Sequence, residues 1–286
     1  MRTCRGGAAK HKSGRVVSGE QELGRKPDWA VARERSRASQ PGETLWLFGL
    51  HAVRDGLLSP VRDRRRLIVT RNAAERLAEA IAASGMTPEI ADARRFPAPI
   101  DPQSVHQGAA LEAVPLDWGS VSERCAPRGA APLVLLLDRV SDPHNVGAVL
   151  RSAEVFGARA VIAPHRHSAP ETGALAKAAS GALERLPYLR VPNLAAAMGA
   201  LREMGYAIVG LDGAAEIELA PALAEFSGRP LALAFGAEGP GLRELTSKLC
   251  DRMARIPAAG AFGSLNVSNA AAVALYAATR ARAAGV

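Results

Sequence analysis

Three short segments in the C-terminal half of the chain concentrate residue types that can bind a small molecule and take part in group transfer. Each segment follows an apolar run whose composition suits a buried strand. The segments are LLDRVSDPHNVGAVLRSAEVFG over residues 136–157, FGAEGPGL over 235–242 and IPAAGAFGSLNVSNAAAVALY over 256–276. They combine flexible glycines, carboxamides, hydroxyls, one arginine and one carboxylate, so we expect a ligand site where the strand ends meet.

The first segment predicts a turn that leads into a helix, with Asn145 as the N-cap. The helix should pack through an apolar face formed by Val146, Val149, Leu150 and Ala153. Arg151 lies beside that face, and a helix that follows the carboxyl end of a parallel strand can direct such a residue toward the ligand crevice. A solvated arginine with no role is the alternative.

The second segment is a glycine-rich turn that contains Gly236, Glu238 and Gly241. Its glycines allow a ligand to approach the backbone and bind peptide N–H groups. The spacing differs from the G-x-G-x-x-G pattern of dinucleotide sites, and Glu238 would repel a pyrophosphate, which argues against a nucleotide-dependent oxidoreductase. A turn that binds nothing stays open as an alternative.

The third segment places Ser264, Asn266 and Ser268 where the last helix should begin. Small hydroxyl and amide side chains at such a position can cap the helix or bind a ligand. Capping alone would explain any one of them. Three together beside a second glycine-containing loop favour a binding role.

The apolar runs that position these segments predict an α/β protein with a parallel sheet covered by helices on both faces. The runs show little polar alternation, as is typical of strands buried on both sides. They lie at 133–137, 160–163, 207–211, 231–235 and 253–257, and an Ala-rich helix should follow from about 267 to 282. The sequence before them predicts a smaller α/β unit, with strands near 45–50, 67–70 and 109–114 and a helical stretch at 73–84.

We therefore expect four parts along the chain. Residues 1–43 contain ten Lys and Arg against five Asp and Glu without apolar periodicity, which indicates a basic, disordered tail. Residues 44–115 form the small domain, the Pro- and Gly-rich residues 116–131 a linker, and residues 132–286 the larger domain. The tail has two open interpretations, namely a solvated leader without a role and a segment with loose attraction to RNA.

Charge and composition narrow the class of partner. The formal net charge of +8 favours a polyanion, with nucleic acid first and an anionic membrane surface second. The three cysteines have no paired spacing, and no run of roughly 18 apolar residues is present, so we expect a cytoplasmic protein without disulfides or a membrane anchor. The pair His165 and His167 lacks a third ligand of suitable spacing, so we expect no metal.

Taken in order, the three segments resemble the motifs of the SpoU (TrmH-like) family of RNA 2'-O-ribose methyltransferases in the SPOUT superfamily. LD-x-V-x-DP-x-N-x-G-x3-R-x-A matches Leu137 to Ala153, FG-x-E-x2-GL matches Phe235 to Leu242, and the IP…G…SLNVS block matches Ile256 to Ser268. Upstream, GLHAVRDGLL at 49–58 and VHQG at 105–108 resemble the family's N-terminal substrate-binding domain, which has a ribosomal-protein-like fold.

The resemblance implies a deep trefoil knot in the larger domain and S-adenosylmethionine as cofactor. Residues that would bind the cofactor are Gly236, Gly241, Ile256 and Leu265, and those of the reaction centre are Asn145, Arg151, Glu238, Ser264 and Asn266. The family's proposed base is the arginine, but a guanidinium normally stays protonated. Arg151 could instead bind an RNA phosphate and orient the ribose, with Glu238 orienting Arg151, and His144 is an alternative base.

The resemblance also implies a homodimer whose sites are completed at the subunit interface. The N-terminal domain favours 23S rRNA, at a guanosine, over tRNA. Two alternatives remain open at this point: a tRNA 2'-O-ribose methyltransferase and a catalytically silent RNA-binding protein of the same fold.

Overall fold

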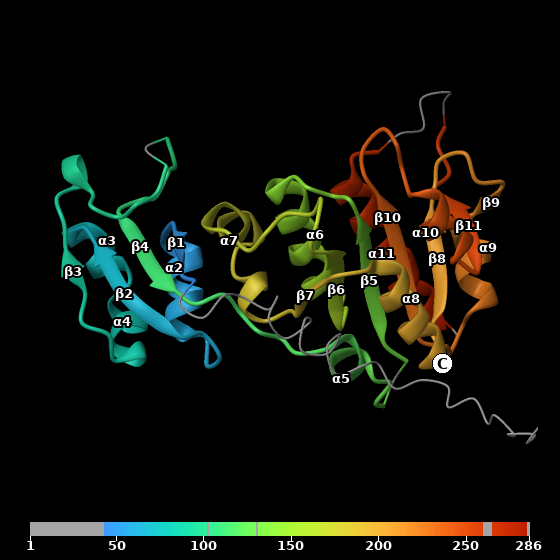
Figure 1. The fold of residues 1–286 in the computed structure, drawn as a ribbon, viewed down its shortest axis with the longest axis horizontal. Helices are drawn as coiled ribbons and strands as arrows, with labels where there is room; N and C mark the ends of the chain where they lie inside the picture. Colours follow the sequence, from blue (N-terminus) through green and yellow to red (C-terminus); the bar gives the residue numbers. More distant parts are fainter. Residues whose placement is uncertain (1–42, 102, 130, 260–264, 285–286) are drawn as a thin grey trace, which may run out of the picture. The chain divides into compact units, whose positions relative to one another are not determined.

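A seven-stranded sheet, entirely parallel, organises the C-terminal half of the chain (Figure 1). The structure is a computed structural model that describes residues 43–101, 103–129, 131–259 and 265–284. Along the sheet the order is β7 (Tyr188–Val191), β6 (Ala160–Pro164), β5 (Leu133–Asp138), β10 (Leu231–Gly236), β8 (Ala207–Leu211), β11 (Arg252–Arg255) and β9 (Ile217–Glu218). The parallel sheet expected from the apolar runs is confirmed.

Helices cover both faces of this sheet because successive strand residues alternate between them. Leu133, Leu135 and Leu137 belong to the apolar core that includes α6 (Pro143–Val155), α9 (Leu219–Glu225) and α11 (Val267–Ala284). Val134 and Leu136 face the opposite core, with α8 (Leu194–Glu203) and α5 (Val121–Cys125). The expected α/β class with helices on both faces is therefore confirmed.

Helix α6 begins earlier than the sequence predicts. Its N-cap is Asp142, whose Oδ1 accepts the amide of His144 at 3.0 Å, and Pro143 occupies the first turn. Proline at the first helical position needs no hydrogen-bond acceptor for its nitrogen and has a φ that suits a helix. Asn145 therefore lies inside the helix, and its expected role as the N-cap is wrong. This leaves its carboxamide free for a tertiary contact.

The apolar face expected for α6 is confirmed, since Val146, Val149, Leu150 and Ala153 are all fully buried. The helix also passes very close to α7 (Gly173–Ala179) at Gly147. A Cβ added to Gly147 would lie 2.4 Å from the Cβ of Ala178. The small residue thus allows α6 to pack closely and fixes the position of Asn145 two residues earlier.

The N-terminal part contains a four-stranded sheet of order β1-β4-β2-β3 (Figure 1). Its strands are β1 (Leu45–Phe48), β2 (Arg64–Val69), β3 (Glu89–Ile90) and β4 (Ala109–Ala113), and its helices are α2 (Leu50–Leu58), α3 (Arg71–Arg76) and α4 (Ala78–Ser84). The strands β1 and β2 both pair antiparallel with β4, whereas β3 pairs parallel with β2. The expected strands and helical stretch of residues 44–115 are present. The ribosomal-protein-like fold stays a prediction.

Residues 116–131, expected to be a linker, include helix α5. Ser120 and Glu123 form a capping box, in which each side chain accepts the other residue's backbone N–H. Cys125 at the end of α5 is fully buried, and its carbonyl accepts the hydroxyl of Tyr206 at 2.7 Å. The segment therefore packs against the large sheet through specific contacts, which its Pro- and Gly-rich composition did not predict.

Two predictions concern residues that the structure does not describe, and several elements that it does describe were not predicted. The predicted basic tail, apart from Glu43, and Ser264 fall outside the described residues. The strands β3, β7 and β9 and the helix α10 (Glu244–Lys248) were not predicted from the sequence. In the described part of the chain, no helix combines the length and hydropathy that a membrane span requires.

Candidate functional site

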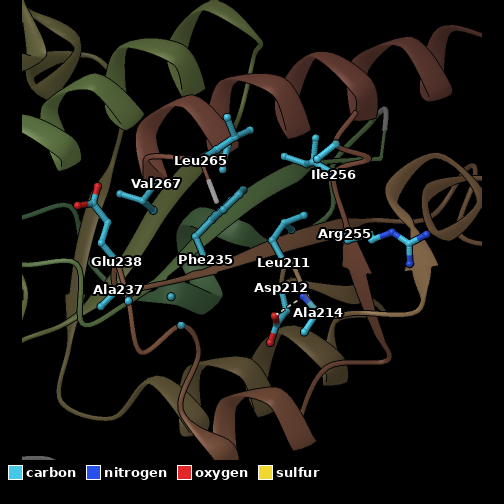
Figure 2. Close-up of a pocket in the computed structure, with 16 residues that line it drawn as sticks. Leu211, Asp212, Ala214, Phe235, Ala237, Glu238, Arg255, Ile256, Leu265 and Val267 are labelled. Carbon is cyan, nitrogen blue, oxygen red and sulfur yellow. Dashed lines mark hydrogen bonds between the residues drawn. The ribbon is translucent and has the colours of Figure 1, made fainter. Parts of the chain in front are cut away.

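A pocket of about 600 Å³ opens at the carboxyl ends of β8, β10 and β11 (Figure 2). This is the edge at which open parallel sheets bind their ligands. The pocket is lined by Leu211, Asp212, Gly213, Ala214, Phe235, Gly236, Ala237, Glu238, Gly239, Gly241, Arg255, Ile256, Ala258, Leu265, Val267 and Ala270. Its volume is within the range of roughly 300–1,000 Å³ that is typical of small-molecule sites.

Apolar side chains gather round the centre of the pocket, from Leu211, Phe235, Ile256 and Leu265 (Figure 2). Leu265 is 47% exposed, an unfavourable state for a leucine that a bound apolar group would relieve. Arg255 points away from the centre, because its guanidinium donates to the carbonyls of Ala215 and Glu216. The walls thus suit a flat apolar group more than a phosphate.

The glycine-rich turn folds back on the strand that precedes it. Ala237 and Gly241 form an antiparallel bridge, and the amide of Gly241 donates to the carbonyl of Ala237 at 2.9 Å. A Cβ on Gly236 would lie 2.0 Å from the carbonyl carbon of Gly241, so no other residue fits there without opening the turn. The close approach at Gly236 therefore determines the shape of the pocket floor.

A buried carboxylate holds the end of this turn. Asp138, the last residue of β5, is fully buried and lies opposite Gly236 in the register of β5 and β10. Its Oδ2 accepts the backbone N–H of Arg243 at 3.1 Å and the hydroxyl of Thr246 at 2.6 Å, while its Oδ1 accepts the Nε of Arg243 at 2.7 Å. Charge-assisted bonds of this kind are stronger than neutral ones. Asp138 thus fixes the start of α10 and the turn before it.

The nearby Cys250 does not offer a nucleophile. Burial raises the pKa of its thiol to about 12, with the neighbouring Asp251 adding to the effect. The Sγ donates to the carbonyl of Thr246 at 3.3 Å. The thiol therefore stays protonated at neutral pH and has a structural role beneath α10.

Asn145, Glu238 and Asn266 form a hydrogen-bonded cluster at the rim of the pocket. The Nδ2 of Asn145 donates to Glu238 Oε1 at 3.2 Å. The Nδ2 of Asn266 donates to the same Oε1 and to Asn145 Oδ1, the latter at 3.0 Å. The cluster brings together the start of α6, the glycine turn and the residue before α11. Three of the five residues expected at the reaction centre are therefore adjacent.

Asn266 also caps α11, which confirms the capping interpretation of this segment, while ligand binding stays a prediction. Its Oδ1 accepts the backbone N–H of Ser268 at 2.9 Å and the hydroxyl of Ser268 at 2.6 Å. The carboxamide therefore uses its oxygen to start the helix and its nitrogen to hold Glu238. Asn266 connects helix α11 to the site.

Arg151 lies apart from this cluster. It is exposed on α6 and has no hydrogen bond or ion pair with the described residues. The expectation that Glu238 orients Arg151 is not met among the described residues, because the Glu238 carboxylate accepts its hydrogen bonds from the carboxamides of Asn145 and Asn266. His144 is likewise exposed near the start of α6. The described residues also contain no group of three or more His, Cys, Asp and Glu side chains placed to hold a metal ion.

Comparison with protein families assigns the larger part of this architecture. Residues 132–276, about half of the chain, match the SpoU rRNA Methylase family. The chain belongs to this family. The matched residues include strands β5 to β11, the glycine-rich turn and all three residues of the Asn145–Glu238–Asn266 cluster.

Alignments with individual relatives extend the similarity beyond the residues that the family model covers. The chain is 38% identical to the 23S rRNA (guanosine-2'-O-)-methyltransferase RlmB of Pseudomonas putida, over 82% of this chain and 96% of that protein. The relative of the same name from Ralstonia nicotianae is 39% identical over 82% of this chain and 95% of that protein. The Vibrio vulnificus relative is 48% identical over 153 residues, a shorter alignment that covers 61% of its length.

Solved structures confirm the SpoU fold. The SpoU methyltransferase AviRb from Streptomyces viridochromogenes, solved in complex with its cofactor AdoMet, has a TM-score of 0.70 at 24% identity, over 85% of this chain and 92% of that one. An AdoMet-bound rRNA methyltransferase from Sinorhizobium meliloti has a TM-score of 0.68 at 22% identity, over 88% and 90% of the two chains. The predicted knot stays a prediction.

The sequence located most of the site but missed its supporting residues. Gly236, Gly241, Ile256 and Leu265 were expected at a cofactor, and all four line the pocket. Asp138 and Thr246 were not singled out, nor were the pocket residues Leu211 and Asp212. For Asp138 the available signal was a charged residue at the end of an otherwise apolar strand, since a carboxylate buried there requires specific partners.

Replacing Asp138 should loosen the glycine turn. We expect Asp138→Ala to lower the free energy of unfolding by about 1–3 kcal/mol, because the buried Thr246 hydroxyl and the Arg243 amide lose their acceptor. Urea denaturation measures the loss. Cleavage after Glu238 by a glutamate-specific protease should also become faster than in the unchanged chain.

The matched control is Asp63→Ala, which removes a carboxylate from an ion pair with Arg65 in which both side chains are more than half exposed. Such pairs contribute about 0–1 kcal/mol. Equal losses of stability for the two variants, or unchanged cleavage after Glu238 in Asp138→Ala, would contradict the role assigned to Asp138.

Proposed function

We propose that this chain transfers a methyl group from S-adenosylmethionine to a ribose 2'-hydroxyl of 23S rRNA, at a guanosine. The observation that supports this most directly is the position of the Asn145–Glu238–Asn266 cluster at the rim of a pocket of suitable size. Membership of the SpoU family and the alignment with RlmB of Pseudomonas putida over nearly its whole length support the same activity.

The residues of the pocket fit S-adenosylmethionine. Ile256 and Leu265 offer apolar surfaces for the adenine, and the absence of a side chain at Gly236 lets the turn approach the cofactor closely. Glu238 supplies a carboxylate at the rim, where a positive charge would be favourable. When bound, the cofactor supplies a methyl group on a positively charged sulfur, already activated for transfer.

The chain must then align the ribose and provide for the proton of its 2'-hydroxyl. Alignment of two reacting groups can contribute several kcal/mol, roughly 7–11 in favourable cases. Asn145 and Asn266 hold the Glu238 carboxylate in one orientation. The carboxamide of Asn145 retains one donor and one acceptor site for a further hydrogen bond, whereas that of Asn266 is fully used. We assign these residues to fixing the ribose, with Ser264 as a further member of the site. Arg151 binds the RNA phosphate and is the candidate proton acceptor.

The geometry of α6 favours a site shared between two copies of the chain. Arg151 follows Asn145 by six helical residues, which corresponds to about 9 Å of rise and to a different side of the helix. Arg151 of one copy therefore does not reach the cluster of that copy easily. Exposed apolar residues on α6 and α11, namely Val155, Val273 and Tyr276, supply a surface for a second copy. We propose a homodimer in which Arg151 completes the partner's site.

The proposed function also gives a role to each of the remaining parts of the chain. Residues 44–115 form a substrate-binding domain that contacts the rRNA, residues 116–131 join it to the catalytic domain at 132–286, and the basic residues 1–43 add non-specific attraction to RNA. A protein that modifies bacterial rRNA works in the cytoplasm. The two alternatives are a methyltransferase that acts on tRNA and an RNA-binding protein without catalytic activity, and the next experiment distinguishes both from the proposed function.

The purified chain should methylate unmodified 23S rRNA transcript when S-adenosylmethionine is supplied. After digestion of the RNA to nucleosides, mass spectrometry should detect 2'-O-methylguanosine, with at most one such nucleoside per transcript. Asn266→Ala should lower the rate by about tenfold or more, because Glu238 loses one of its two orienting donors. Methylation of a tRNA pool with no product on 23S rRNA would contradict the substrate, and no product on either would contradict the enzyme.

A complementation experiment tests the shared site. Arg151→Ala and Asn145→Ala chains are each expected to be inactive, but a heterodimer co-expressed with two affinity tags should regain activity. One of its two sites then combines an intact Asn145 with the partner's intact Arg151. If both residues act within one chain, each site of the heterodimer lacks one of them and no activity returns. Light scattering should show a dimer for every variant, and a monomeric unchanged chain would contradict the proposal.

A further inference from the structure

Two basic loops lie beside the pocket, over a different part of the same sheet edge. One loop follows β5 and contains Arg139, and the other follows β6 and contains Arg166 and His167. The strand order places β5, β6 and β7 on one side of β10, and the pocket strands β8 and β11 on the other. The Asn145–Glu238–Asn266 cluster lies at the junction, since it joins α6, which follows β5, to the turn after β10.

The two loops are held together and are well anchored. The amide of Ala169 donates to the carbonyl of Val140 at 3.3 Å, which links one loop to the other. The second loop is fixed further by the hydroxyl of Tyr188, which donates to the carbonyl of Ala169 at 2.9 Å, and by the buried Ser168, which donates to Pro164. The basic side chains therefore project from a rigid support.

Both loops contain a residue in a conformation that is unusual for its type. Arg139 has a φ of 65° and His167 a φ of 62°, in the left-handed region that non-glycine residues seldom occupy. Glycine or asparagine would be more favourable at either position. Such backbone strain is found preferentially at functional sites, where the side chain is needed for another purpose.

The charges of the two arginines are not paired inside the described structure. Arg139, Arg166 and His167 are exposed, and none of them has an ion pair among the described residues. The carboxylate within the first loop, Asp142, accepts the amide of His144 as the cap of α6. Glu171, just after the second loop, is occupied by Arg62 and by the amide of Leu116. The guanidinium groups of Arg139 and Arg166 are thus available to an anionic partner.

We propose that Arg139, Arg166 and His167 bind the phosphate backbone of the substrate RNA next to the target nucleotide, so that the acceptor strand enters over β5 and β6 while the methyl donor enters over β8 and β11. This rests on the proposed function, because it names the surface by which the same site takes its RNA. Arginine suits the role, since its planar donors match phosphate oxygens. The Asn145–Glu238–Asn266 cluster then lies where the RNA and the methyl donor meet.

The test measures binding of the full-length chain to unmodified 23S rRNA transcript by filter binding at several salt concentrations. The variant is Arg139→Asn combined with Arg166→Gln, in which asparagine tolerates the left-handed backbone and preserves the fold. We expect roughly tenfold weaker binding at moderate salt and a slope of log K against log salt that is smaller in magnitude by about 1.4–1.8. Calorimetry with S-adenosylmethionine should give the same affinity as for the unchanged chain.

The control is Arg128→Gln, which removes an exposed arginine before β5, at the opposite edge of the sheet. A double variant that binds rRNA with the affinity and salt slope of Arg128→Gln would overturn the proposal. If the double variant instead shifts the oligomeric state in light scattering with the salt slope unchanged, a second copy of the chain covers the loops, and the proposal is also wrong. Failure of the proposed function is distinguishable, because the unchanged chain would then not methylate the transcript.

Discussion

The site depends on the way the chain turns back on itself after β10. Gly236 admits the backbone of Gly241 at a distance that excludes any side chain, and Asp138 on the neighbouring strand holds the far end of the turn through Arg243 and Thr246. A carboxylate is worth burying at this point only because three donors surround it. The turn thus receives a fixed shape, and with it the position of Glu238 and the floor of the pocket.

Glu238 transmits that shape to the two helices that complete the site. Its Oε1 accepts from Asn145 at the start of α6 and from Asn266 before α11, so three segments distant in sequence share one acceptor. The helices in turn are fixed by ordinary packing, such as the close contact of Gly147 with α7. The consequence is a division of the sheet edge, with the pocket over β8, β10 and β11 on one side of the cluster and basic loops over β5 and β6 on the other.

The parallel sheet and the pocket residues could be predicted because their signals are local. Apolar runs define buried strands, and Gly236, Gly241, Ile256 and Leu265 belong to compact motifs directly after strands. The N-cap of α6 was misassigned because Asp142 and Asn145 are both good caps, and only Pro143 at the first helical position distinguishes them. The structural role of Asp138 could not be predicted, since it depends on hydrogen bonds with Arg243 and Thr246, more than a hundred residues later in the sequence. Arg151 lies apart from the cluster and has no partner among the described residues, so the role proposed for it rests on a second chain, which no local pattern specifies.

The central claim is that the pocket shaped by the folded-back glycine turn is the site of the methyl donor. Isothermal calorimetry with S-adenosylmethionine on the unchanged chain and on Gly236→Ala tests it most directly, because the added Cβ must displace the backbone of Gly241. The account predicts one binding event per chain that is lost, or weakened by about a hundredfold or more, in a Gly236→Ala variant whose circular dichroism is unchanged. Equal affinity for the two proteins, or no binding to the unchanged chain, would contradict it.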